Sequence, residues 1–299
     1  MNFINNLIVK FVKILPESVV YVFAKKYIAG IKLEEAVAET QKLNAMGICA
    51  TMDILGEAIQ NKEEAVSAKN EILEILDAIE EQKLDSNVSI KPTQLALGLD
   101  NDLCFELFDE ICGKAKELNN FIRIDMEDSP YTDATFELLG KLHKKYDNVG
   151  IVVQAYLRRT IGDVKEWNPT GVTYRLCKGI YVEPEEIAFK GYQEVRDKYL
   201  EALEIMLDNG NYVGIATHDD YLVEGAYKQI KEKNIAKDKY EFQMLYGVKP
   251  ALRDRINADG HKIRIYVPFG KSWYAYSIRR LQENPNMAWY ITKSILTGQ

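Results

Sequence analysis

The chain alternates short runs of β-branched and apolar residues with longer amphipathic stretches, and this alternation repeats eight times after an N-terminal segment. Parallel strands joined by helical crossovers produce such a pattern. The expected strands cover residues 48–54, 88–91, 121–126, 150–155, 173–178, 212–217, 241–245 and 263–267, and a last helix covers residues 272–283. Because no linker rich in Pro, Gly or Ser divides the series, we predict an α/β fold closed into one (βα)8 TIM-like barrel, with an open sheet as the alternative.

Local signals support the helices between these strands. Asn61 and Glu64 have the spacing of a capping box, and apolar residues follow them at helical intervals. Ser129, followed by a proline, is expected to cap another helix. Asn209 and Gly210 predict the end of the long charged helix after the fifth strand.

Composition is compatible with one large domain. Of 299 residues, 47% are apolar and 28% charged, and the net charge of −7 comes from interleaved acidic and basic residues. We therefore expect an N-terminal helical segment over residues 1–45, a barrel over residues 46–299, and no nucleic-acid partner. The four cysteines form no CxxC pair, which predicts buried free thiols and a reducing cytoplasm.

The apolar stretch at residues 7–15 is interrupted by Lys10 and Lys13, and no small-residue cleavage site follows it. This pattern favours neither a signal peptide nor a spanning helix. An amphipathic helix packed on the domain is the preferred interpretation, and a helix lying on a membrane surface is the alternative.

The carboxyl ends of the expected strands are unusually polar, and in a (βα)8 barrel those ends form the active site. The polar residues there are Asp53, Lys91, Asp125, Glu127, Gln154, Arg175, Lys178, His218, Asp219, Glu241, Gln243 and Tyr266. Lys91 could be simply solvated, could bind a carboxylate, or could serve as an amine nucleophile. His143 and His261 lie in a charged helix and a turn, so a multi-histidine zinc site is not expected.

Arg279 and Arg280 are adjacent on the last helix. Arg280 with Glu283 could be an ordinary surface pair worth about 0.2–0.5 kcal/mol. Alternatively, both guanidinium groups could converge on a small anion near the edge of the helix, beside Tyr266 and Tyr276. No GxGxxG or Walker sequence occurs, so a Rossmann domain is not supported.

At the strand ends, eight segments resemble proline dehydrogenase, in the monofunctional bacterial form related to the dehydrogenase part of larger proline-utilisation proteins. They are VSIKPTQLALGLD, RIDMED, VQAYLRRT, YRLCKGIYVEP, ATHDD, YEFQMLYGV, RIYVPFG and YSIRRLQEN, in that order between about residues 49 and 284. The resemblance implies a distorted barrel, noncovalent FAD over the strand ends, and a final helix across the barrel mouth.

The resemblance also implies roles for particular residues. The proline carboxylate would be bound by Lys91, Arg279 and Arg280. The proline ring would be enclosed by Tyr266, Tyr276 and Leu245. The flavin and its phosphates would be held by Gln154, Arg175, Cys177, Lys178, Gly179, Ile180, Thr217 and His218. Asp125 and Glu283 would orient the cations.

Cys177 and Ile180 depart from the aliphatic and small residues of the family's RLVKGAY segment, but both are apolar enough to keep the role. A tyrosine at Tyr276 favours proline over hydroxyproline as substrate. The implied reaction is hydride transfer from proline C5 to flavin N5, which yields Δ1-pyrroline-5-carboxylate. The implied electron acceptor is a membrane quinone. The chain would reach it by peripheral contact with the inner face of the membrane. A separate pyrroline-5-carboxylate dehydrogenase could take the product.

Three other functions remain open from the residues alone. A Schiff-base lyase of the aldolase type would use Lys91 or Lys178. An amino-acid or flavin binding module would hold ligand without turnover. A metal-dependent hydrolase would need Asp125, His218 and Glu241 to be free of competing salt bridges.

Overall fold

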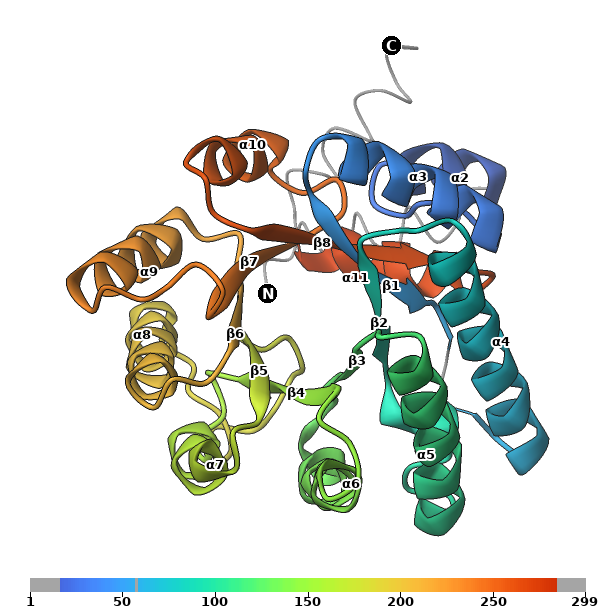
Figure 1. Ribbon diagram of the computed structural model, residues 1–299, viewed down its shortest axis with the longest axis horizontal. Helices are drawn as coiled ribbons and strands as arrows, with labels where there is room; N and C mark the ends of the chain where they lie inside the picture. Colours follow the sequence, from blue (N-terminus) through green and yellow to red (C-terminus); the bar gives the residue numbers. More distant parts are fainter. Residues whose placement is uncertain (1–16, 57–58, 284–299) are drawn as a thin grey trace.

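Eight parallel strands close into a barrel surrounded by helices (Figure 1). The computed structural model describes residues 17–56 and 59–283. The strands are β1 (Cys49–Ile54), β2 (Ser86–Ile90), β3 (Ile122–Ile124), β4 (Val149–Gln154), β5 (Thr173–Cys177), β6 (Val213–Ala216), β7 (Tyr240–Leu245) and β8 (Ile263–Phe269). Each strand pairs with its neighbours in the sequence, and β1 pairs with β8 to close the ring. The predicted barrel is confirmed, and the alternative open sheet is wrong.

Helices cover the outside of the barrel. They are α2 (Glu17–Ala24), α3 (Leu33–Ala45), α4 (Lys62–Glu81), α5 (Asn101–Glu117), α6 (Thr132–His143), α7 (Thr160–Trp167), α8 (Tyr192–Asp208), α9 (Asp220–Glu232), α10 (Pro250–Ala258) and α11 (Trp273–Glu283), with short 3₁₀ turns at Pro92–Leu95, Ser129–Tyr131 and Asn168–Thr170. α2 and α11 pack together, with the rings of Tyr21 and Trp273 meeting edge to face at 4.9 Å between centroids. Within the described residues, no helix combines the length and apolar character needed to cross a membrane. The stretch at residues 7–15 lies outside the described residues.

The Asn61 cap and the end of α8 are as predicted, but the return bond of the capping box goes to Gln60 instead of Asn61. The Asn61 side chain accepts a hydrogen bond from the backbone N–H of Glu64 at 2.9 Å, while Glu64 bonds back to the N–H of Gln60. The helix α8 ends at Asp208, before Asn209 and a left-handed glycine. The prediction for Ser129 is wrong, because its hydroxyl donates to a carboxylate of the β5–α8 loop instead of capping α6.

The two faces of the strands differ in chemistry. Side chains such as those of Met52, Ile90 and Ile124 point toward the helices and form one continuous apolar core. The interior of the barrel holds buried polar groups instead, among them Arg123, Arg175, Arg264, Glu241 and Gln243. Bulky aliphatic side chains usually fill a barrel of this type. The charges inside this one must therefore be paired with opposite charges or, as for Arg123, hydrogen-bonded to backbone carbonyls to be tolerated.

Glu241 and Arg264 form the lower part of this interior. Glu241 is the second residue of β7, so it lies at the amino end of the barrel and not at the mouth, where the sequence pattern had predicted it. Arg264 Nε donates to Glu241 Oε1 at 2.7 Å. Burial opposes ionisation of Glu241, but Arg264 and Lys262 outweigh it and lower its pKa to about 2.

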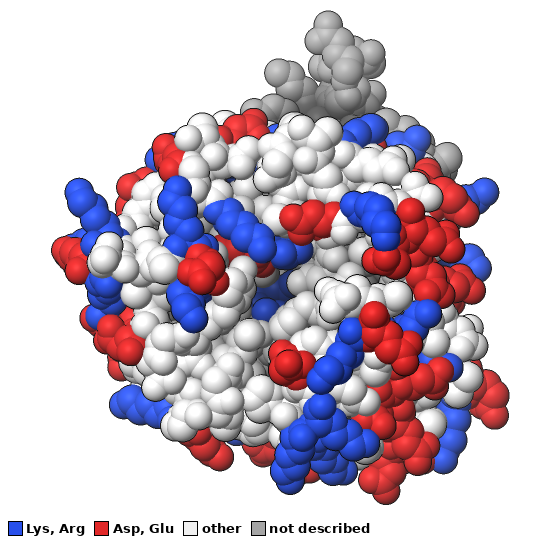
Figure 2. Space-filling view, in the orientation of Figure 1, with Lys and Arg blue, Asp and Glu red and all other residues white. Residues whose placement is uncertain are grey.

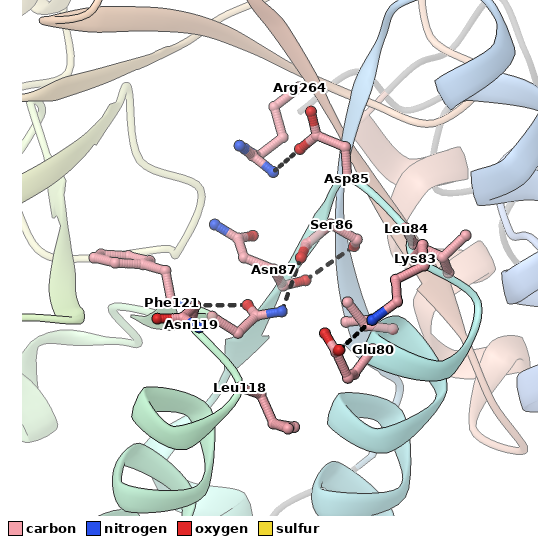
Figure 3. Close-up of a pocket in the computed structure, with 12 residues that line it drawn as sticks. Glu80, Lys83, Leu84, Asp85, Ser86, Asn87, Leu118, Asn119, Phe121 and Arg264 are labelled. Atoms are coloured by element: carbon pink, nitrogen blue, oxygen red, sulfur yellow. Dashed lines mark hydrogen bonds and ion pairs between the residues drawn. The ribbon is translucent and has the colours of Figure 1, made fainter.

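A cavity of about 410 Å³ opens beside Arg264. It lies at the amino ends of β2 and β3 and the last turn of α4, and its walls include Asp85, Asn87 and Asn120 (Figure 3). On the face seen in Figure 2, acidic and basic side chains are interspersed around a central hollow in which basic atoms are visible. The cavity thus lies beside the Glu241–Arg264 pair, at the amino end of the barrel.

Removing the Glu241 carboxylate should unfold the protein more easily, because Arg264 would then be buried without its counter-charge. Glu241→Ala is expected to lower the free energy of unfolding by about 3–5 kcal/mol. Glu224→Ala, which removes a surface partner of Arg255, should cost at most about 1 kcal/mol. Urea unfolding measures both values, and equal losses would contradict the account.

The same pair predicts a pH dependence of stability. The pKa of Glu241 in the folded state lies below its value in the unfolded chain, which is about 4.3. The contribution of this carboxylate to the free energy of unfolding is therefore complete at a pH above about 4.3. It should decline as the pH falls toward about 2. The difference in stability between the native chain and Glu241→Ala should narrow over that range.

Candidate active site

The polar residues at the carboxyl ends of β1, β2, β3 and β8 form one hydrogen-bonded cluster. Lys91 Nζ lies 2.7 Å from Asp53 Oδ1 and 3.4 Å from the Tyr266 hydroxyl. The Tyr266 hydroxyl in turn donates to Asp125 Oδ2 at 2.9 Å. Three of the residues predicted for the substrate site, Lys91, Asp125 and Tyr266, are thus brought together.

Arg175 extends this cluster into the barrel. Its Nη1 donates to Asp125 Oδ1 at 2.8 Å and to the Ser89 hydroxyl at 2.7 Å. Its Nε donates to Gln243 Oε1 at 2.5 Å, and its guanidinium lies 5.3 Å from the centroid of the Tyr266 ring. Arg175 is only 6% exposed, so these contacts fix it in place.

The protonation states of the cluster follow from its charges. Burial opposes the charge on Lys91, but Asp53 and Asp125 outweigh it and raise the pKa of Lys91. Burial raises the pKa of Asp53, and burial together with Asp125 raises the pKa of Tyr266 far above its ordinary value. Lys91 therefore stays a cation and Tyr266 stays a hydroxyl donor at neutral pH.

A second cluster surrounds Asp219 at the ends of β5 and β6. Lys178 Nζ lies 3.2 Å from Asp219 Oδ2, and Arg196 binds both oxygens of the same carboxylate at 2.9 and 2.7 Å. Burial opposes ionisation of Asp219, but Arg196 and Lys178 outweigh it and hold its pKa well below the usual range. The Thr217 hydroxyl accepts from the Asp219 backbone N–H at 3.1 Å, which fixes the turn.

The segment after β5 depends on a glycine. Gly179 has a φ of +104°, and an added Cβ would lie 2.1 Å from the ring of Tyr156. The neighbouring Cys177 thiol donates to the Val153 carbonyl at 3.6 Å, and burial raises its pKa to about 11. Ile180 is 44% exposed and does not join either cluster.

Gln154 lies at the end of β4 and is buried. Its amide nitrogen donates to the Glu127 carbonyl at 2.8 Å, and the Glu127 side chain is held by the N–H and hydroxyl of Thr93. The amide oxygen of Gln154 and the Nη2 nitrogen of Arg175 are buried without a hydrogen-bond partner among the described residues. Buried polar atoms of this kind are ordinarily satisfied by a ligand or water.

His218 and Leu245 are also neighbours. His218 Nε2 accepts from the Leu245 backbone N–H at 2.8 Å, which leaves the proton of the neutral ring on Nδ1. Tyr276 of α11 is buried and near enough to Tyr266 to raise its pKa, so α11 reaches the mouth of the barrel. The side chains of Arg279, Arg280 and Glu283 lie outside the described part of the chain.

Several supporting residues were not predicted from the sequence. Ser89 precedes Lys91 by two positions in β2 and therefore shares its face, a signal that strand periodicity could have provided. Arg196 lies on α8, and Glu183 lies in the β5–α8 loop, where it accepts two hydrogen bonds from Ser129. Their partners are far away in the sequence, so no local pattern could identify them.

The arrangement argues against two of the alternative functions. The proposed hydrolase trio does not assemble, because Glu241 is bound by Arg264 at the other end of the barrel. In the residues that the structure describes, no group of three or more His, Cys, Asp or Glu side chains could hold a metal ion. A lyase using Lys91 would need a neutral amine there, whereas the carboxylates around it raise its pKa, and the Lys178 amine is bound to Asp219 at 3.2 Å.

A closed barrel with buried cations and carboxylates at the carboxyl ends of its strands defines a (βα)8-barrel enzyme. The family model "Proline dehydrogenase" matches residues 36–291. The chain therefore belongs to the proline dehydrogenase family.

Individual relatives agree with this assignment. The chain is 37% identical to "Proline dehydrogenase 2" of Bacillus subtilis (strain 168), over 89% of this chain and 88% of the relative. It is 33% identical to "Proline dehydrogenase" of Deinococcus radiodurans, over 92% and 90%. The crystal structure of proline utilization A from Bdellovibrio bacteriovorus, inactivated by N-propargylglycine, aligns with a TM-score of 0.83 at 26% identity, covering 88% of this chain and 33% of that chain.

Gly179 provides a test of the local geometry. Gly179→Ala combines a positive φ with a collision with Tyr156, so it should destabilise the fold by about 2–4 kcal/mol. Gly171→Ala has a similar φ of +75° but nothing within 4 Å of its added Cβ, so it should cost only about 1–2 kcal/mol. Thermal unfolding compares them, and a smaller loss for Gly179→Ala would be inconsistent with this packing.

Proposed function

We propose that this proline dehydrogenase oxidises L-proline to Δ1-pyrroline-5-carboxylate with noncovalent FAD at the carboxyl ends of the strands. The observation that carries the proposal is the buried cluster of Lys91, Asp125, Tyr266 and Arg175, in a chain of this family. Its cations can bind a carboxylate, and the buried polar atoms that lack hydrogen-bond partners among the described residues can bind a planar heterocycle.

The buried polar atoms fit a flavin. The Gln154 amide oxygen can accept one hydrogen bond, and Arg175 Nη2 can donate two, and neither atom has a partner among the described residues. A flavin ring carries both kinds of complementary group. Thr217, His218 and the segment formed by Cys177, Lys178, Gly179 and Ile180 would hold the rest of the cofactor.

The substrate would bind on the other side of the cluster. Lys91, with Arg279 and Arg280 from α11, would hold the proline carboxylate by charge-assisted hydrogen bonds. Tyr266, Tyr276 and Leu245 would enclose the ring, and Asp125 and Glu283 would orient the cations.

FAD supplies the hydride acceptor when it is bound. Proline must lose a hydride from C5 and a proton from its nitrogen to form the C=N bond of the product, so it has to react as the free amine. The rate should therefore rise with pH until the amine is deprotonated. Lys91 keeps its charge over this range because its pKa is raised, so the carboxylate contact persists.

The electrons would pass to a quinone, and the chain would work in the cytoplasm with peripheral contact to the inner face of the membrane. The N-terminal segment is the proposed contact. Deleting residues 1–30 should reduce co-sedimentation with liposomes, and unchanged co-sedimentation would remove this idea. A pyrroline-5-carboxylate dehydrogenase is the expected consumer of the product.

The flavin site can be tested without turnover. We expect Gln154→Leu to weaken FAD binding to the apoprotein about tenfold, the equivalent of one hydrogen bond. Gln41→Leu, at an exposed position on α3, should leave the dissociation constant unchanged. Flavin fluorescence titration measures both constants, and equal affinities would contradict the placement of the flavin.

The paired arginines predict a different kinetic effect. Arg279→Ala or Arg280→Ala should raise the KM for proline and leave the flavin content near normal. The decrease in kcat/KM should correspond to a loss of about 2–5 kcal/mol of transition-state binding. Arg255→Ala, on the surface of α10, is the control and should leave KM unchanged. Loss of FAD in both variants would mean that α11 has another role.

A further inference from the structure

Gln243 is enclosed between two charged groups in the barrel interior. It lies in β7 and is 5% exposed. Its amide oxygen accepts from Arg175 Nε at 2.5 Å, and its amide nitrogen donates to Glu241 Oε1 at 2.6 Å. Among the residues that the structure describes, it therefore bridges the upper cluster and the Glu241–Arg264 pair.

The orientation of this amide is determined by its neighbours. An arginine side chain can only donate hydrogen bonds, and an ionised carboxylate can only accept them. A flipped amide would lose both bonds, because its nitrogen would then face the donor Nε of Arg175 and its oxygen would face the acceptor Oε1 of Glu241. Arg264 binds Glu241 at 2.7 Å and so holds the acceptor in place.

The resulting chain of contacts crosses the barrel. It begins at Arg264 on the wall of the amino-end cavity (Figure 3) and continues through Glu241 and Gln243 to Arg175. At Arg175, Gln243 binds Nε while Ser89 and Asp125 bind Nη1. The direction of the remaining nitrogen, Nη2, is thereby fixed.

Packing around Gln243 supports a specific position for its amide. Gly214 on β6 faces it, and a Cβ at Gly214 would lie 2.5 Å from the Gln243 amide nitrogen. The backbone of Gly214 has an ordinary φ, so the glycine is needed here for space and not for conformation. The neighbouring strand thus leaves room for this one orientation.

We propose that Gln243 is a positioning residue for the redox reaction, holding Arg175 so that Nη2 faces the flavin. The inference rests on the proposed flavin site. A positive charge fixed at that point stabilises the negative charge that the reduced ring acquires.

The direct test replaces Gln243 in the holoenzyme. Gln243→Met keeps the length of the side chain but removes both hydrogen bonds. The rate of anaerobic flavin reduction by proline should fall about ten- to a hundredfold, as expected for a small displacement of a positioning group. The flavin midpoint potential should become more negative, and the KM for proline should change little.

Gln243→Glu provides a conservative variant with a distinct signature. A protonated carboxyl at this position can donate to Glu241 and accept from Arg175, as the amide does. The charged groups around it are Arg175 on β5, Glu241 on β7, Arg264 on β8, Arg123 on β3 and, across the barrel, Asp125. As the pH rises, two adjacent carboxylates would repel each other. The reduction rate relative to the native chain should therefore be highest at low pH and fall as the pH increases.

Gly214→Ala displaces the same amide without altering it. It should lower the reduction rate and the midpoint potential in the same direction as Gln243→Met. Gly162→Ala, with nothing within 4 Å of its added Cβ, is the matched control and should leave both unchanged. If Gln243→Met fails to fold, Gln243→Glu and Gly214→Ala still decide the question.

The outcomes separate this inference from the proposed function. A native chain that binds no flavin overturns the proposed function itself. A native chain reduced by proline, with Gln243→Met and Gly214→Ala variants of unchanged rate and potential, overturns only the role of Gln243. A loss of thermal stability with unchanged rate and potential also overturns it, because the role would then be structural.

Discussion

Compensation of buried charge inside the barrel is the constraint on which the rest of the structure depends. Arg175 and Arg264 are both more than nine-tenths buried, and each is bound to an acidic residue. An unpaired charge at such depth would cost several kcal/mol. The interior must therefore keep the carboxyl groups of Asp125 and Glu241 in place beside these cations, and this requirement fixes the side chains above and below them.

The same pairing of charges also fixes the side chains at the mouth of the barrel. Asp53 and Asp125 keep Lys91 charged, and Asp125 accepts a hydrogen bond from Tyr266. Side chains fixed in this way lose little further freedom when a ligand binds, which is the physical basis of preorganisation. The strands carry the cluster, and Tyr276 of α11 lies near Tyr266.

The fold could be predicted from the sequence because it depends on periodicity. All eight strands lie within two residues of their expected bounds, since apolar runs and glycine or asparagine stops are local signals. The contacts of the site were less accessible. Polar residues at strand ends could be recognised, but Glu241 was assigned to the wrong end of its strand. A short strand gives no local sign of where it begins, and Glu241 is the second residue of β7.

Roles that depend on distant partners could not be found from local patterns. The Ser129 hydroxyl binds Glu183, and Arg196 binds Asp219, across 54 and 23 positions of the sequence respectively. Gln243 could be noticed as polar, but its importance follows only from Arg175 and Glu241 lying on either side of it. Such roles become visible only when the barrel has closed.

The cluster around Lys91 and Arg175 is proposed to bind both a flavin and proline. The visible spectrum of the purified chain, recorded before and after anaerobic addition of L-proline, tests it most directly. The account predicts flavin absorption bands that bleach on addition of proline. A colourless protein that does not bind added FAD, or flavin bands that proline leaves unchanged, would contradict it.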